Sequence, residues 1–282
     1  MSRIKTGKEG QKSRETHGYL MTGIDFTGRK PECVRDLRNL VEDESLTRFD
    51  LAVMSAMYGL WKEKTEQGYD VCSMTYQQIC RTMNGISGTK RVCTATTESV
   101  RRSVEKLSRL WVHVETADGN MIALTAFGQN EPIGMERAEN LLSVIRCDEV
   151  YHGHSIAGIT LLRCPVLCRY AEAAGRMKEI PGGLWNINTE TGKQLRIMER
   201  TIAFRDTLTE YVITKKHRKG KDFCVELKEI TENAGISFES LSRKRKQRDR
   251  ELIGMILDCF VKAGYLRGFT IDLETKMVEF QV

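Results

Sequence analysis

Residues 74–127 read MTYQQICRTMNGISGTKRVCTATTESVRRSVEKLSRLWVHVETADGNMIALTAF. The spacing of apolar residues in this stretch predicts a short helix over Tyr76–Met83. Asn84-Gly85 breaks that helix, and a longer one is predicted from about Thr96 to Leu110. A short helix, a tight turn and a longer helix in this order are the feature on which the fold prediction rests.

Two strands are expected to follow the longer helix. Trp111–Thr116 and Met121–Phe127 alternate apolar and polar residues, and Asp118-Gly119 between them is a strong two-residue hairpin signal. An amphipathic helix from Leu46 to about Gly68 comes before the whole stretch. Three helices followed by a hairpin form a more specific pattern than any one of these elements.

The longer helix has an apolar side and a basic side. At about one hundred degrees per residue, Val100, Val104 and Leu107 stack on one side. The other side is basic, although Glu98 and Glu105 dilute its charge. Helices with a basic side often read DNA, whereas mixed charges also occur on ordinary solvated helices. The candidate DNA-contacting residues of this unit are Lys90, Arg91, Thr97, Arg101, Arg102 and Lys106.

The C-terminal part of the chain repeats this order. A helix is predicted over Leu195–Lys215, a short strand over Phe223–Leu227 and a short helix over Lys228–Ala234. The triplet Gly-Ile-Ser stands at 235–237 and at 85–87, in both cases between a short helix and the longer helix that follows. We interpret this correspondence as an internal repeat at the level of architecture.

The densest positive charge of the chain opens the last predicted helix. Leu252, Ile256 and Phe260 form an apolar face in the second half of that helix, so packing should anchor this half and leave the basic half to project outward. Arg pairs bidentately with guanine and Lys neutralises phosphate, so such a helix suits the major groove. A hairpin of Tyr265–Asp272 with Lys276–Val282 is expected next. The candidate DNA-contacting residues of the run are Arg243, Lys244, Arg245, Lys246, Arg248 and Arg250.

Composition limits the class of protein. A chain of 282 residues with 40% hydrophobic content suffices for two domains. The net charge is only +6, because 38 Asp and Glu offset 44 Lys and Arg, so a nucleic-acid footprint must come from clustered charge. No apolar run is long enough for a membrane segment and the first thirty residues are polar and basic, so we expect a cytoplasmic protein. Nine irregularly spaced cysteines fit a reducing compartment without a structural disulfide.

The sequence divides into four expected parts. Residues 1–30 are basic with few large apolar side chains and are expected to form a flexible arm. Residues 31–128 and 196–282 hold the two units of helices and hairpin. Residues 129–195 are expected to be a linker or interdomain segment, with a helix over Met135–Ile145 and one strand further on.

One short motif is the strongest sign of an enzyme. Tyr151-His152-Gly153-His154 resembles the paired histidines that hold a metal in rolling-circle nicking enzymes, with Tyr151 or Tyr170 as nucleophile, but that motif has an apolar residue between its histidines. Cys147, Cys164 and Cys168 do not combine with these histidines at zinc-ribbon spacing. No phosphate-binding loop of the Walker type is present. We therefore expect no enzymatic activity, no metal site and no cofactor.

The tandem pattern resembles the plasmid replication initiator proteins. The resemblance covers about 46–127 and 196–282 and implies an α+β, mainly helical fold of two winged-helix domains, each a helix-turn-helix with a β-hairpin. In that family the C-terminal domain is the main reader of the site, and the N-terminal domain contacts the adjacent groove and dimerises. Residues 129–195 depart from the family pattern. Implied major-groove contacts are Arg243, Lys244, Arg245, Lys246 and Arg248, and implied adjacent contacts are Thr97, Arg101, Arg102 and Lys106.

The implied function is sequence-specific binding of double-stranded DNA at the origin repeats of a plasmid or mobile element. The protein would then recruit host replication proteins, and a homodimer is a further implied state. A transcriptional regulator with the same two DNA-reading helices is the alternative, because a fold alone does not separate these functions.

Overall fold

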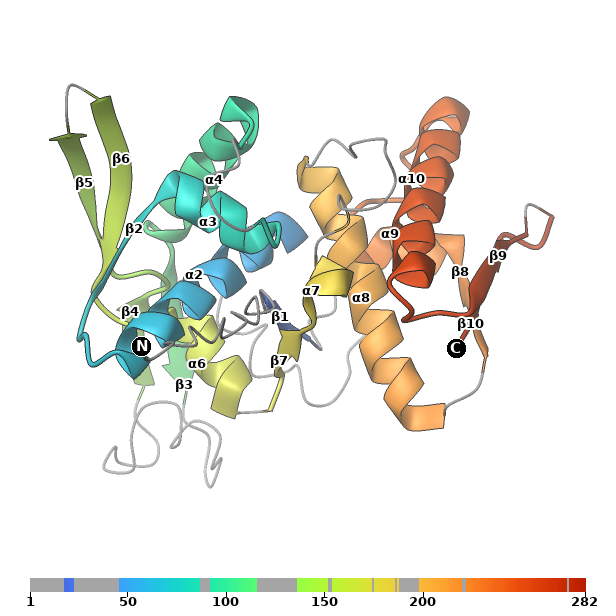
Figure 1. The fold of residues 1–282 in the computed structure, drawn as a ribbon, viewed down its shortest axis with the longest axis horizontal. Coiled ribbons are helices and arrows are strands. Elements are labelled where there is room, and N and C mark those ends of the chain that lie inside the picture. Colours follow the sequence, from blue (N-terminus) through green and yellow to red (C-terminus); the bar gives the residue numbers. More distant parts are fainter. Residues whose placement is uncertain are drawn as a thin grey trace, which may run out of the picture.

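The computed structural model describes residues 18–22, 46–86, 92–115, 136–151, 154–173, 175–185, 187, 198–219, 222–272 and 274–282. It has an α+β fold in which helices alternate with small antiparallel sheets (Figure 1). No helix within these ranges is both long and apolar enough to cross a membrane.

Helix α2, Arg48–Glu66, is the centre of the N-terminal half. Its cap is reciprocal, because the Thr47 hydroxyl accepts from the backbone N–H of Asp50 at 3.1 Å and the Asp50 carboxylate accepts from the backbone N–H of Thr47 at 2.9 Å. The sequence predicts a single apolar face here, but every residue from Arg48 to Tyr58 is buried. Elements from both halves of the chain pack around this part of the helix and cover all its sides.

A short strand and two helices follow α2. Strand β2, Cys72–Thr75, leads into α3, Tyr76–Met83, which has the predicted bounds. Helix α4, Thr94–Leu107, begins two residues before the predicted start at Thr96. Gly85, in the turn after α3, has a φ of 59°, in the left-handed region that favours glycine.

The sheet of this half is built from a segment that the sequence assigns to a linker. Strands β5, Val144–Tyr151, and β6, His154–Leu161, form an antiparallel hairpin, and β6 also pairs with β2, which gives the strand order β2-β6-β5. The expected helix over Met135–Ile145 is wrong, because strand β4, Glu136–Asn140, and the start of β5 occupy it. Pairing with distant strands overrides the helix-forming residues of this segment.

Strand β3, Trp111–Glu115, pairs with β4 in a separate two-stranded sheet. The expected hairpin partner of β3, Met121–Phe127, lies outside the described residues, as does Asp118-Gly119. The hairpin that joins β2 is thus β5–β6, and β3 and β4 lie in the chain between α4 and this hairpin.

Strand β1, Gly18–Met21, corrects the expected flexible arm for these residues. It pairs with β7, Met177–Ile180, in an antiparallel ribbon. Leu20 is buried in the core of the C-terminal half and Met21 in the core of the N-terminal half. The few apolar side chains of this polar segment are therefore used to join the two halves.

Two short helices flank β7. Helix α6, Val166–Ala173, packs on α2, and α7, Gly182–Trp185, follows β7. Trp185 is buried in the core of the C-terminal half. The segment expected as a linker therefore supplies a hairpin to one half and a large core side chain to the other.

The C-terminal half has the predicted element order. Strand β10 lies between β8 and β9, so the strand order β8-β10-β9 matches β2-β6-β5 in chain sequence and in antiparallel pairing. Its elements are α8, Glu199–Lys219; β8, Phe223–Glu226; α9, Leu227–Asn233; α10, Arg243–Lys262; β9, Gly268–Ile271; and β10, Met277–Gln281.

The correspondence defines two repeats. We call α2, β2, α3, α4, β5 and β6 the N-terminal repeat, and α8, β8, α9, α10, β9 and β10 the C-terminal repeat. Gly235 after α9 has a φ of 76° and corresponds to Gly85 after α3. The repeat predicted from the Gly-Ile-Ser triplets is thus present in the element order and in the sheets.

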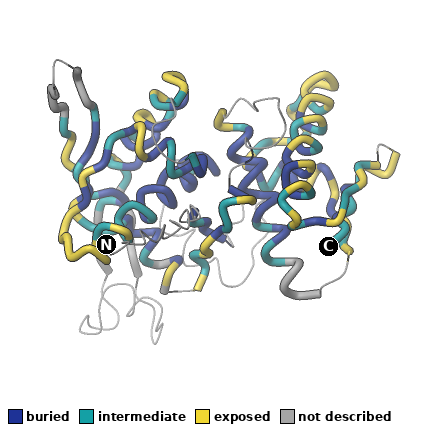
Figure 2. The backbone as a smooth tube through the Cα atoms, viewed as in Figure 1, coloured by how far each residue is buried: buried dark blue, intermediate teal, exposed yellow. Residues whose placement is uncertain are grey.

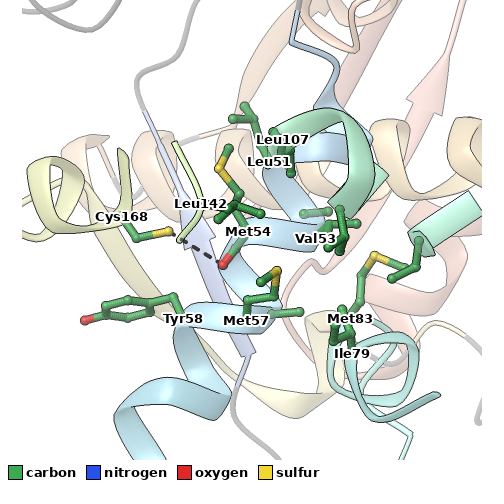
Figure 3. Close-up of a cluster of buried hydrophobic side chains, with 14 of the residues drawn as sticks. Leu51, Val53, Met54, Met57, Tyr58, Ile79, Met83, Leu107, Leu142 and Cys168 are labelled. Atoms are coloured by element: carbon green, nitrogen blue, oxygen red, sulfur yellow. Dashed lines mark hydrogen bonds between the residues drawn. The ribbon is translucent and has the colours of Figure 1, made fainter. Parts of the chain in front are cut away.

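Each repeat has its own hydrophobic core. Figure 3 shows part of the first, where Met54 and Met57 of α2 lie close to Met83 of α3 and Leu107 of α4. Cys168 of α6 joins this core, and its thiol lies 3.6 Å from the carbonyl oxygen of Met54. Figure 2 shows buried residues concentrated along the inner elements of both halves.

Candidate nucleic-acid interface

Helix α10 begins at a serine cap and is anchored by its second half. The Ser242 hydroxyl accepts from the backbone N–H of Arg245 at 3.3 Å. Ile253, Ile256 and Phe260 are fully buried in the core of the C-terminal repeat. The first half of α10 therefore stands out from the body of the protein, and Figure 2 shows its upper turns as largely exposed.

The six basic residues predicted to contact DNA in α10 differ in exposure. Lys246 and Arg250 are half-buried, and the Lys246 ammonium lies 4.2 Å from the centroid of the Phe238 ring. The other four are exposed, and none of them forms an ion pair with another residue that the structure describes. We call these four the α10 basic face: Arg243, Lys244, Arg245 and Arg248.

Asp249 fixes the basic half of α10 to α8. Its side chain is 6% exposed, and it accepts hydrogen bonds from Nε of Arg200 at 2.6 Å and from Nη2 of the same residue. A carboxylate held by two guanidinium N–H groups has one preferred geometry, so the contact orients the exposed turns of α10. The sequence pattern alone does not predict this pair. The available signal was an acidic residue inside a basic run, in helical register with the buried Ile253 and Ile256.

An ionised glutamate lies just before α10. Glu239 accepts a hydrogen bond from the Lys228 ammonium at 3.1 Å, and this bond lowers the pKa of Glu239, with a smaller contribution from Lys246. The same bond raises the pKa of Lys228. Both groups therefore keep their charges at neutral pH at the edge of the candidate interface.

Arg101 and Arg102 are exposed on α4. The Arg101 guanidinium donates to the Glu105 carboxylate at 3.3 Å, and this hydrogen bond raises the pKa of Arg101. Arg146 of β5 lies 3.5 Å from the same carboxylate. Glu105 thus offsets part of the positive charge, and α4 presents less net positive charge to solvent than the α10 basic face.

Lys106 and Thr97 are engaged within the protein. The Lys106 ammonium lies 3.0 Å from the Asp50 carboxylate, whose side chain is 5% exposed, and Ser103 donates to the same carboxylate at 2.6 Å. Lys106 therefore links α4 to α2. The sequence predicts that Lys106 projects outward toward DNA, but in the structure its ammonium is directed to Asp50. Thr97 is half-buried, and its hydroxyl donates to the carbonyl oxygen of Cys93 at 3.3 Å.

The first turns of α4 and α10 lie at the same edge of the molecule, the upper edge in Figure 1. Figure 2 shows exposed residues on both of these turns. Lys90 and Arg91, which the sequence adds to the α4 group, lie outside the described residues. The first turns of the two helices predicted to read DNA thus reach the same edge of the molecule in this view.

The residues of the enzymatic and zinc alternatives are only partly described. Cys168 is buried and Cys147 is half-buried as free thiols. Among the residues that the structure describes, no three His, Cys, Asp or Glu side chains gather in a group able to hold a metal ion. The structure does not describe His152 and Gly153. It describes only the backbone of Tyr151, His154 and Tyr170.

Comparison with known proteins gives only distant structural similarity. No protein-family model matches the chain, and no curated protein matches it. Among solved structures, the chain is similar to the crystal structure of selenomethionine derivatives of domain 2 and domain 3 of RctB. The two are 13% identical, the match covers 76% of this chain and 70% of that chain, and the TM-score is 0.39. A match of this size assigns neither a fold family nor a function.

Proposed function

We propose that the chain is a non-enzymatic, sequence-specific double-stranded DNA-binding protein that initiates replication of a plasmid or mobile element. It would bind origin repeats through both repeats of its fold and recruit host replication proteins. The observation that carries this proposal is the α10 basic face, four exposed cations on the first turns of a helix whose second half is locked in a core.

The positive charge on these turns would be stabilised by a bound polyanion. Four cations within six residues repel one another, and the positive end of the helix dipole adds to the same potential. Phosphates neutralise both, and the exposed Arg side chains can pair bidentately with guanine in the major groove. The α10 basic face is therefore proposed to enter that groove.

The element order supports a winged helix for each repeat. In the C-terminal repeat, α9 and α10 would form the helix-turn-helix and β9–β10 the wing. In the N-terminal repeat, the wing would be β5–β6 instead of the hairpin expected after Trp111. Helix α4 would contact adjacent DNA through Arg101 and Arg102, with less charge than α10.

Binding and its salt dependence test the DNA-binding part. A gel-shift with DNA from next to the gene should show a specific complex. Arg245→Ala should weaken it and reduce the slope of log K against log salt by about 0.9, the value for one lost phosphate contact. Lys178→Ala is the matched control, since it removes an exposed positive charge on β7, away from α10. An unchanged slope for Arg245→Ala would mean that Arg245 does not contact phosphate.

Replication in cells separates an initiator from a transcriptional regulator. The gene and its flanking DNA are cloned on a vector without an origin and introduced into suitable hosts. Maintenance of the vector supports initiation, and loss of maintenance by the Arg245→Ala gene connects initiation to the α10 basic face. Failure to replicate in any host would favour the regulator. Cleavage of supercoiled origin DNA with a covalent protein adduct would contradict the non-enzymatic assignment.

A further inference from the structure

The two short helices that precede α4 and α10 end at carbonyl groups bound by side chains of the other half of the chain. The last carbonyls of a helix have no partner within the helix. In α3 these include the carbonyls of Thr82 and Met83, and in α9 the carbonyl of Asn233. Each of these three oxygens accepts a side-chain hydrogen bond from far away in the sequence.

The end of α3 is capped from the C-terminal half. Nε1 of Trp185 donates to the Thr82 carbonyl at 2.6 Å, and Nη1 of Arg205 on α8 donates to the Met83 carbonyl at 2.7 Å. The Arg205 guanidinium lies 3.9 Å from the centroid of the Trp185 ring, so the two donors also support each other. A cation at a helix C-terminus is further favoured by the helix dipole.

The end of α9 is capped from the N-terminal repeat. Nε of Arg48, the first residue of α2, donates to the Asn233 carbonyl at 2.8 Å. Nη1 of the same guanidinium lies 2.9 Å from the Glu210 carboxylate on α8. The short helix of each half is thus capped by side chains of the other half. We call the three hydrogen bonds donated by Trp185, Arg205 and Arg48 the reciprocal cap.

The donor side chains of the reciprocal cap are buried. Arg48 is 3% exposed, and Arg205 and Trp185 are each 1% exposed. Arg205 also donates to the buried Asp206 at 2.8 Å; burial raises the pKa of this carboxyl, and the guanidinium opposes the rise. A sliding or rotation of one repeat against the other would separate the buried Arg48 charge from Glu210 and would remove the Met83 acceptor from Arg205, which is strongly unfavourable.

We infer that the reciprocal cap fixes α4 and α10 in one geometry, so that the chain recognises two DNA elements at one fixed spacing. Helix α3 packs on α4, and both α9 and α10 pack on α8, so the caps are connected to both helices through rigid contacts. Arg48 and Arg205 are positioning residues in this scheme. The DNA part of the inference rests on the proposed function, whereas the fixed geometry does not.

A distance measurement tests the geometry without DNA. Cys93, just before α4, and Cys224, on β8, are exposed and in no disulfide, and they can carry nitroxide labels once Cys33, Cys147 and Cys164 are replaced by serine. Pulsed electron resonance should give a narrow distance distribution for the wild-type background. The distribution should broaden in Arg48→Lys, which keeps the charge but loses the fork of N–H donors, and in Arg205→Lys.

A matched control and a refuting result complete this experiment. Arg163→Lys removes a guanidinium whose Nε donates to Ser143 at 2.6 Å within the N-terminal half, and it should leave the distribution narrow. Circular dichroism confirms that each variant is folded before the distances are compared. A broad wild-type distribution, or narrow distributions in both folded cap variants, would overturn the fixed geometry.

Binding to spaced sites tests the DNA part. Duplexes are selected from a random pool by the wild-type protein, and two or five base pairs are then inserted between the two elements of the footprint. Five base pairs are about half a helical turn, so wild-type affinity should fall by about tenfold or more. Arg48→Lys should show a smaller loss on insertion than the wild type does.

The outcomes separate the two claims. Tight binding that ignores insertion would refute the fixed spacing while leaving DNA binding intact. A narrow distance distribution without any selected DNA would refute the proposed function while leaving the reciprocal cap intact.

Discussion

Replacement of Asp249 by Asn distinguishes two opposite roles for the one buried acid of the basic half of α10. If Asp249 only added negative charge near DNA, the neutral variant would bind DNA more tightly. If Asp249 positions the helix through Arg200, the variant would bind more weakly, because the exposed turns would lose their fixed orientation. We expect weaker binding.

The magnitude follows from burial and partner geometry. Removal of one member of a fully buried ion pair costs about 3–5 kcal/mol of unfolding free energy. Arg200 is 23% exposed, so water can solvate its guanidinium, and Asn can still accept one of the two hydrogen bonds. We therefore expect a loss of about 2 kcal/mol for Asp249→Asn. The affinity for DNA should fall by about tenfold, or about 1.4 kcal/mol.

Urea unfolding and gel-shift titration measure the two quantities. Glu251→Gln is the matched control: it removes an exposed acid from the same helix, one that accepts a hydrogen bond only from Gln247 among the described residues. The control should keep its stability and bind DNA slightly more tightly, through charge alone. Equal or tighter binding by a folded Asp249→Asn variant would refute the positioning role.

Three further predictions concern other parts of the fold. Lys106→Met should lower the unfolding free energy by about 1 kcal/mol, because the ion pair with Asp50 is lost. The slope of log K against log salt for DNA binding should stay unchanged, and a reduced slope would show that Lys106 contacts phosphate. Gly18→Ala places a Cβ 2.6 Å from the buried Trp185 ring and should cost about 2 kcal/mol in urea unfolding, so a neutral effect would contradict the close packing. Hydrogen bonds from a threonine hydroxyl and two backbone N–H groups lower the pKa of Asp272. The ionised Asp272 side chain therefore stabilises the β9–β10 turn above the unfolded-state pKa of about 3.9, and this stabilisation is lost as pH falls through the lower pKa of the folded state. Amide protection factors in β9 and β10 should therefore drop in acid for the wild type but not for Asp272→Asn, and equal pH profiles would refute this.

Local patterns made much of the C-terminal repeat predictable. The positions of α9 and β8, to within one residue at each end, and the pairing of β9 with β10 follow from apolar periodicity and turn residues close together in the chain. The exposure of the basic run of α10 was equally predictable from the sequence, because the charged residues and the apolar stripe lie on one helix. The pairing of Asp249 with Arg200 could not be predicted, because the two residues lie 49 positions apart in the sequence.

The N-terminal half was predicted less well for a physical reason. Glu136–Asn140 and Val144–Tyr151 contain helix-forming residues, and their strands exist because β3 and β6 supply partners for them. Asp118-Gly119 and the strand expected after it lie outside the described residues, and within the described part β3 pairs with β4. The reciprocal cap was likewise beyond prediction, because each of its hydrogen bonds joins residues more than a hundred positions apart.

The pairing of β1 with β7 sets an order of events during synthesis. Gly18 lies opposite Ile180, so about 160 residues must be made before β1 has a partner, which takes about 8–30 s at ordinary translation rates. Until then Leu20 and Met21 remain exposed to water or to chaperones. Strand β1 is thus made about 160 residues before its partner, so the ribbon that ties it to both cores can form only after β7 has been synthesised.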